Sequence, residues 1–154
     1  MATELTNLKY ELNKLGEESK KFLIDVLQRN GKIASGDLIK SIDYKVIEDA
    51  NGILLKIIAN ETFNFVDEGR RPGARMPPIT PIENWMKRKG IGFKKMSSKS
   101  AAFLVARSIS QKGIKPLRLK KQLVNDFLGN RAQVLLKAAA QKDIQKIIDN
   151  IVSK

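Results

Sequence analysis

Apolar residues recur every three or four positions over residues 3–29, which is the spacing of one face of an α-helix. The stripe consists of Leu5, Leu8, Leu12, Leu15, Phe22 and Val26, with Ser19 in its single gap. Asn30 and Gly31 follow it and favour the left-handed turn that ends many helices. The other face mixes Glu and Lys, so we expect it to face solvent or another chain, and the apolar stripe to cover the protein's own sheet rather than form a coiled coil.

Residues 42–59 have the alternating pattern of a β-hairpin. A loop with a short helical turn over residues 31–42 leads into Ile42, Tyr44 and Val46, which alternate with polar residues. Asn51-Gly52 then favours a tight turn, and residues 53–59 return as an almost wholly apolar strand. We expect a third strand at residues 63–69, so that three antiparallel strands with the long helix across one face form an α+β layer.

A short helix is predicted after an exposed loop. Residues 70–79 are rich in Arg, Pro and Gly, which indicates the loop. Thr80 is expected to cap the helix, with Pro81 at its first position and Glu83 completing a capping box. Trp85 lies on this helix and is assigned to its buried side rather than to the stacking of nucleic-acid bases.

A further helix is expected to begin at Ser97 or Ser98 and to end at Gly113. Its inner face would allow close packing against the sheet or a neighbour, because it consists mostly of small side chains, Ala101, Ala102, Val105, Ala106 and Ile109. Residues 114–119 are irregular in pattern, and residues 120–152 are helical with a break at Gly129-Asn130.

These elements predict an α+β fold. A long N-terminal helix packs on a small antiparallel sheet with a β-hairpin, and short helices and a C-terminal helical segment follow. We expect two parts, an α+β domain of residues 1–120 and a helical extension of residues 121–154.

The chain of 154 residues has a formal net charge of +13, and this charge is concentrated. Arg70 to Lys121 contain fifteen Lys or Arg and one acid, Glu83, a net of +14, so that the rest of the chain sums to −1. A basic segment of this kind indicates an acidic partner surface, either nucleic acid or a negatively charged protein. Lysines that serve only solubility are the plainer alternative.

The composition argues against most catalytic chemistry. The chain has no Cys and no His, which removes thiolate nucleophiles, the usual zinc ligands and the commonest general base. Asp67 and Glu68 are adjacent acids, but in the expected strand they would point to opposite faces, and no third ligand stands at a fixed spacing. We therefore predict a structural ion pair for these acids, and no catalytic residue, metal site or cofactor.

No apolar run approaches the roughly 20 residues that a membrane span requires. Residues 1–7 also lack the apolar core of a signal peptide, so we expect a soluble protein that is cytosolic when made.

Arg70, Arg71 and Arg75 have side chains suited to hold either phosphates or carboxylates. Few aromatic residues accompany them, and no helix-turn-helix, RNA-binding or zinc-finger pattern is present, so the sequence supports only non-specific contact with nucleic acid. Prolines stiffen the loop at residues 72, 77 and 78. A stiff, projecting loop favours docking to a partner, because it loses little entropy on binding.

Several short motifs follow one another over residues 1–120. They are Gly31-x-x-Ala-Ser-Gly-Asp-Leu-x-x-Ser-Ile42, then the hairpin, then Phe65-Val66-Asp67-x-Gly69-Arg-x-Pro-Gly73, then Met76-Pro-Pro78, then Ile82-x-x-Trp85-x-x-x-Lys89-Gly-Ile91, then Ala101 to Ile109, and finally Gly113-Ile-x-Pro116. In this order they resemble the neck or tail-completion proteins of tailed bacteriophages. The chain departs from that pattern at Phe65, where many members have Tyr, and at Glu68, where many have an aromatic residue.

The resemblance implies an α+β subunit without catalytic residues that forms a homo-oligomeric ring of about twelve or six copies between the portal and the tail. Such a subunit is made in the host cytoplasm and resides in the neck or tail of the virion. Its partners would be the portal protein and tail proteins, with non-specific contact to the genomic DNA in the channel. The alternative is a small basic protein that binds nucleic acid non-specifically in the cytosol.

The resemblance also directs attention to two sets of residues. Contacts to a partner or a neighbouring subunit are expected from Asp67, Glu68, Arg70, Arg71, Arg75 and Met76. A basic surface facing the portal or DNA is expected from Lys87, Arg88, Lys89, Lys94 and Lys95.

Overall fold

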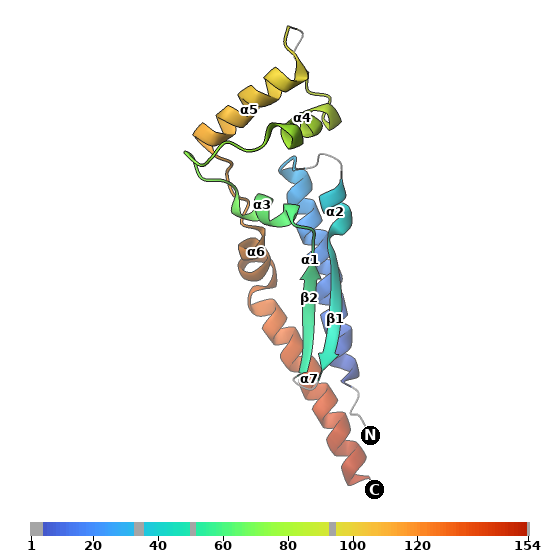
Figure 1. Cartoon of the computed structure of the whole chain (residues 1–154). Coiled ribbons are helices and arrows are strands. Elements are labelled where there is room, and N and C mark those ends of the chain that lie inside the picture. The colour runs from blue at the N-terminus through green and yellow to red at the C-terminus, as the bar shows by residue number, and fades with distance from the viewer. Residues whose placement is uncertain (1–4, 33–35, 50–51, 93–94, 154) are drawn as a thin grey trace. The chain divides into compact units, whose positions relative to one another are not determined.

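The computed structural model describes residues 5–32, 36–49, 52–92 and 95–153, and it has the α+β fold that the sequence predicts (Figure 1). Its elements are α1 (Thr6–Arg29), α2 (Asp37–Ser41), β1 (Asp43–Asp49), β2 (Gly52–Ile58), α3 (Thr62–Glu68), α4 (Ile79–Arg88), α5 (Ser98–Lys112), α6 (Leu119–Lys121), a π-helical segment (Gln122–Leu128) and α7 (Gly129–Val152).

The chain forms two compact units. Unit 1 comprises Met1–Val26, Ile42–Ile58 and Lys120–Lys154, and unit 2 comprises Leu27–Ser41 and Ala59–Leu119. The division into residues 1–120 and 121–154 expected from the sequence stays a prediction. No described helix combines the length and the apolar character that a membrane span requires.

In unit 1 the hairpin is confirmed. Strand β1 pairs antiparallel with β2, from Asp43 opposite Ile58 to Asp49 opposite Gly52. Gly52 has a positive φ of 139°, which suits a turn, while Asn51 of the predicted turn lies outside the described residues. The helix α1 lies along this hairpin (Figure 1), as predicted, and the contact is close. A Cβ atom at Gly16 would stand 2.3 Å from the ring of Tyr44, so a larger residue there would force the Tyr44 side chain to move.

The predicted third strand is wrong, because residues 62–68 form the helix α3 in unit 2. The sheet therefore has two strands among the residues that the structure describes. A local hydrogen bond explains the difference. The side-chain oxygen of Asn60 accepts from the backbone N–H of Thr62 at 3.1 Å, and this Asx turn starts a helix where the alternation of Phe63 and Phe65 had indicated a strand.

The buried face of α1 follows the predicted stripe only in part. Leu12, Leu15, Ser19 and Val26 are buried as predicted, whereas Phe22 is half-buried and stacks on Phe127 with ring centroids 4.7 Å apart. Leu23 and Leu27 are also buried, although the sequence stripe omitted them. The helix ends at Arg29, and Gly31 with φ +62° follows, which confirms the predicted left-handed turn.

The C-terminal helical segment is confirmed, with its break at Gly129. The π-helical segment ends there, since Gly129 has φ +40° and its backbone N–H donates to the carbonyl of Val124. The helix α7 follows and is joined to α1 by an ion pair of 2.8 Å between Arg131 and Glu18.

A second attachment joins α7 to the start of α1. The carboxylate of Asp143 is 2% exposed and accepts from the backbone N–H of Asn7 (3.1 Å), the side-chain amide of Asn7 (2.7 Å) and the backbone N–H of Leu8 (2.9 Å). These backbone groups belong to the first turn of α1, which has no acceptor within its own helix. Burial alone would raise the pKa of Asp143, but the hydrogen bonds from Leu8 and Asn7 outweigh it and hold the pKa below its ordinary value.

In unit 2, α4 packs against α5. Ile82 and Met86 of α4 meet the small face of α5, formed by Ala101, Ala102 and Ala106. The predicted small-residue face is therefore confirmed, and the neighbour that it accommodates is α4. The predicted ends of α5 are confirmed as well, because the hydroxyl of Ser97 accepts from the backbone N–H of Ser100 at 3.1 Å and Gly113 has φ +72°.

Two predictions for α4 are wrong. The helix begins at Ile79 with Pro78 at the cap position and no side-chain cap, so Thr80 and Glu83 do not form a capping box. Trp85 is 39% exposed, because Ile82 and Met86, four residues apart, occupy the inner face of the helix and turn Trp85 to its edge.

Candidate functional site

Two segments that are distant in sequence lie side by side in unit 2. They are the arginine loop, residues 69–76, and the connection at residues 113–118. Arg70 and Ile114 exchange both backbone hydrogen bonds, at 2.9 and 2.8 Å, as an isolated antiparallel bridge. The end of α3 continues this pairing, since Leu117 and Arg118 donate to the carbonyls of Val66 (3.1 Å) and Asp67 (3.0 Å). Four backbone hydrogen bonds therefore hold the end of α3 and the beginning of the arginine loop against residues 114–118.

Glycine is required on both sides of this bridge. Gly69 has φ +65°, and a Cβ atom there would stand 2.3 Å from the carbonyl oxygen of Ile114. Gly113 has φ +72°, and its Cβ atom would stand 2.3 Å from the carbonyl oxygen of Arg70. Positive φ and close backbone approach each favour glycine. Gly69-Arg70 and Gly113-Ile114, which belong to two separate sequence motifs, therefore form the two sides of one backbone bridge.

The second half of the arginine loop is bonded to the end of α5. The backbone N–H of Gly73 donates to the carbonyl of Ser110 at 2.7 Å, and the hydroxyl of Ser110 donates to the carbonyl of Ala74 at 2.6 Å. Within the loop, the guanidinium of Arg70 donates to the carbonyl of Arg75. The half-buried side chain of Arg70 therefore stabilises the conformation of the loop.

The residues predicted to contact a partner separate into an inner and an outer group. Glu68, Arg71, Arg75 and Met76 are exposed, whereas Asp67 is only 7% exposed. Asp67 and Glu68 do point in different directions, but the reason given by the sequence was wrong. They lie on a helix, where successive residues differ by about 100° around the axis, rather than on a strand. Their predicted role in an ion pair stays a prediction.

The predicted basic surface is partly occupied by ion pairs. Lys87 pairs with Glu83 at 3.0 Å and Arg88 pairs with Asp37 at 3.7 Å. Lys89 and Lys95 are exposed, and Lys94 lies outside the described residues.

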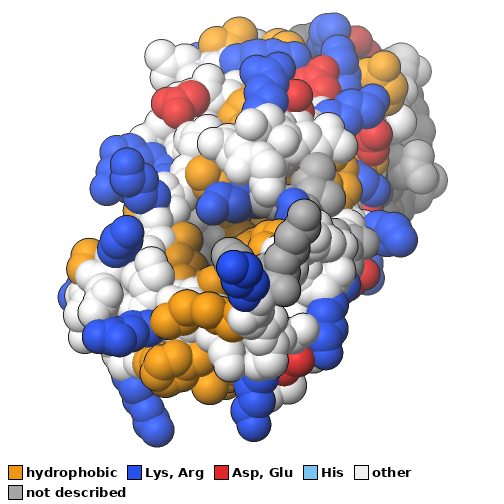
Figure 2. All heavy atoms as spheres, turned by 90° about the horizontal axis from the view of Figure 1, so that it is seen from above, with side chains coloured by type: hydrophobic (Ala, Val, Ile, Leu, Met, Phe, Trp, Pro, Cys, Tyr) orange, Lys and Arg blue, Asp and Glu red, His pale blue; other side chains and the backbone are white. Residues whose placement is uncertain are grey.

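The positive charge of the chain belongs mainly to unit 2. Its sequence has sixteen Lys or Arg and five Asp or Glu, a net of +11, against +2 for unit 1. The space-filling view in Figure 2 shows hydrophobic side chains gathered in patches among Lys and Arg side chains, with fewer Asp and Glu.

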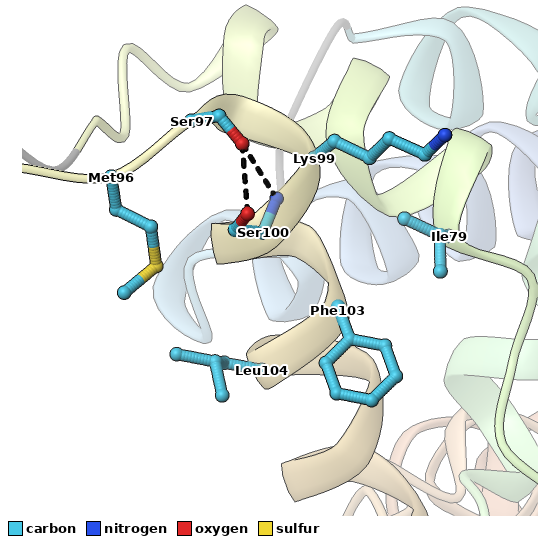
Figure 3. A pocket seen from close by; sticks show the side chains of 7 residues that line it. All are labelled: Ile79, Met96, Ser97, Lys99, Ser100, Phe103 and Leu104. Carbon is cyan, nitrogen blue, oxygen red and sulfur yellow. Dashed lines mark hydrogen bonds between the residues drawn. The ribbon is translucent and has the colours of Figure 1, made fainter.

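An open groove on the outer side of α5 was missed by the sequence reasoning. Its volume is about 460 Å³, and its lining consists of Ile79, Met96, Ser97, Lys99, Ser100, Phe103 and Leu104 (Figure 3). The signal was present in the sequence, because Phe103 and Leu104 directly follow the small pair Ala101-Ala102. Large and small apolar residues in succession place apolar surface on two sides of one helix.

Among the described residues, no group of three or more acidic side chains is arranged to hold a metal ion. Comparison with models of protein families, with curated proteins and with solved structures finds no match for this chain.

Proposed function

We propose that this chain is a structural subunit of the ring that joins the capsid portal to the tail of a tailed bacteriophage. The main support is the bridge between Arg70 and Ile114. It unites residues 65–73 and 113–116, two of the motifs that resemble the neck and tail-completion proteins, in one bonded feature. This contact gives the two motifs a shared structural role, which is to hold the start of the arginine loop.

The arginine loop is suited to contact an acidic surface on a neighbouring subunit or on the portal. Arg71 and Arg75 are exposed on it, while its backbone is fixed by hydrogen bonds to Ser110 and Ile114. A loop that is already ordered loses little entropy when it binds. Ring symmetry repeats each contact in every subunit, so that modest individual contacts add up.

Electron microscopy of the purified protein, alone and mixed with the portal protein of the same virus, tests the proposal. Rings, or subunits bound to the portal, are expected. A protein that stays monomeric and binds neither portal nor tail proteins would overturn the proposal.

Charge-reversal variants test the role assigned to the arginine loop. Arg71→Glu combined with Arg75→Glu is expected to abolish ring formation or portal binding while the circular dichroism spectrum is retained. The matched control is Lys45→Glu combined with Lys56→Glu, which changes the net charge equally at exposed positions of the hairpin. Equal loss of assembly in both double variants would show that total charge, and not this loop, matters.

A second candidate function is non-specific binding of nucleic acid, and the exposed aromatic residues of unit 2 favour it. Trp85 and Phe103 are 39% and 42% exposed in a unit with a net charge of +11, and aromatic rings within a basic surface stack on bases. Trp85 is the single tryptophan, so its fluorescence reports binding of a single-stranded oligonucleotide directly. The expected affinity falls steeply with salt, and absence of binding at low salt would remove this candidate.

A further inference from the structure

The helix α5 exposes large apolar side chains on the part of its surface that Ile82 and Met86 of α4 do not cover, next to Ile79 at the start of α4. Its inner side is filled by Ala101, Ala102 and Ala106, which are buried against α4. On the outer side Phe103 and Leu104 are 42% and 48% exposed, although this side of a surface helix is ordinarily polar. Met96, Phe103 and Leu104 are all exposed and line one groove, and apolar side chains gathered in this way are suited to contact a partner.

The outer apolar residues form the edges of the groove. Figure 3 shows Met96 and Leu104 along one edge and Ile79 and Phe103 along the other, with Ser97 and Ser100 between them. The two hydroxyl groups are 2.9 Å apart and hydrogen-bond each other. They therefore offer few free polar groups, and among the described residues Lys99 is the single charged residue of the lining. A small polar ligand requires several convergent polar groups, so the groove suits apolar side chains instead.

The charge around the groove restricts the partner further. Lys99 lines the groove, Lys95 precedes it, and Arg107 stands one helical turn after Phe103. From Asn84 to Lys121 the sequence contains no acid, and Glu83 already pairs with Lys87. Apolar residues that approach this surface are therefore favoured when acidic residues accompany them.

We propose that this groove binds an amphipathic helical segment of another protein, in which acidic residues flank the apolar ones. Apolar side chains three and four positions apart on such a helix would lie along Met96, Phe103 and Leu104, and its carboxylates would face Lys99 and Arg107. Nucleic acid fits less well, because phosphates gain nothing from Met96 and Leu104. The inference goes beyond the proposed function, since it requires a partner helix and no ring.

Fluorescence anisotropy with the full-length chain tests the inference. The probes are two synthetic fluorescein-labelled helical peptides with the same pattern of Leu residues, one with Glu and the other with Lys at the flanking positions, and a labelled DNA duplex. We expect saturable binding of the Glu peptide, at least tenfold tighter than that of the Lys peptide.

Two variants locate the binding. Leu104→Ser is expected to weaken the Glu peptide at least tenfold, while its matched control Ile148→Ser on α7, at a residue 47% exposed against 48% for Leu104, leaves affinity unchanged. Lys99→Glu is expected to weaken the Glu peptide and to strengthen the Lys peptide. All three substitutions are at exposed positions, and circular dichroism of each variant verifies the fold.

Several outcomes would overturn the inference. They are no saturable binding of the Glu peptide, equal affinity for both peptides, equal effects of Leu104→Ser and Ile148→Ser, or binding of the duplex that Leu104→Ser weakens as strongly as it weakens the Glu peptide. A chain that forms rings but binds neither peptide would refute the groove inference and leave the proposed function in place.

Discussion

Replacement of Asp143 by alanine removes the carboxylate that joins α7 to the first turn of α1. Three hydrogen bonds of 2.7 to 3.1 Å end on this carboxylate, from Asn7 and Leu8. Hydrogen bonds to charged groups contribute about 1.5–3 kcal/mol, and loss of a helix cap costs about 0.5–2 kcal/mol. Because the donors are only partly buried and water replaces some of these bonds, we expect Asp143→Ala to lower the free energy of unfolding by about 2–4 kcal/mol.

The assay is thermal and urea unfolding followed by circular dichroism. For a chain of this length 1 kcal/mol shifts Tm by about 2–4 °C, so Asp143→Ala is expected to lower Tm by about 5–15 °C. Asp143→Asn keeps one acceptor oxygen without the charge and is expected to cost about half as much. The control is Asp126→Asn, at an exposed position of the π-helical segment, where we expect a change within about 0.5 kcal/mol. Equal unfolding midpoints for Asp143→Ala and Asp126→Asn would refute the reasoning.

The same carboxylate predicts a dependence on pH. The pKa of Asp143 in the folded protein lies below its ordinary value of about 3.9, because its hydrogen bonds outweigh the effect of burial. The unfolded chain therefore takes up the proton first as pH falls. The stabilisation is fully present above about pH 5 and is lost as pH drops through the folded pKa. The difference in stability between the natural chain and Asp143→Asn should shrink accordingly below about pH 4.

Three further substitutions test the packing described above, each measured as a change in the free energy of unfolding. Gly69→Ala is expected to cost about 2–4 kcal/mol, because positive φ and contact with the carbonyl of Ile114 both oppose a Cβ atom, whereas Gly73→Ala has positive φ with open space and should cost about 1 kcal/mol. Equal costs would contradict the close approach. Gly16→Ala is expected to cost about 1–3 kcal/mol, because overpacking against Tyr44 outweighs the roughly 1 kcal/mol that alanine gains over glycine inside a helix, and a stabilisation of about 1 kcal/mol would mean that α1 does not lie on the hairpin as described. Ser97→Ala removes the cap of α5 and is expected to cost about 1 kcal/mol of unfolding free energy. An unchanged stability would contradict the cap.

Local signals predicted much of the fold. The alternation before residue 50 and the apolar run after Gly52 gave the hairpin, and Ser97 and Gly113 gave both ends of α5. At each of these places, the preference of neighbouring residues for a strand, a turn or a helix end decides the local structure. The third strand failed for the same kind of reason, since a single hydrogen bond from Thr62 to Asn60 outweighed the alternation of aromatic residues that follows.

The sequence predicted which residues belong to the candidate site, but not how these residues are arranged in space. The sequence placed Arg70, Arg71 and Arg75 in one exposed loop. The structure shows that Arg70 is half-buried and bonded to the carbonyl of Arg75, whereas Arg71 and Arg75 are exposed. Contacts between residues about forty positions apart leave no local pattern. The groove beside Phe103 was not predicted, because the sequence of α5 was interpreted only through the small residues of its inner face.

The attachment of Asp143 to Asn7 has a consequence for the order in which the protein can fold during synthesis. The carboxylate is made 136 positions after the amide that it binds. Until the ribosome has released that segment, the first turn of α1 lacks its acceptor, so α1 is completed only after α7 has been made. A product that stops before residue 143 would therefore lack this acceptor, and the first turn of its α1 would fray.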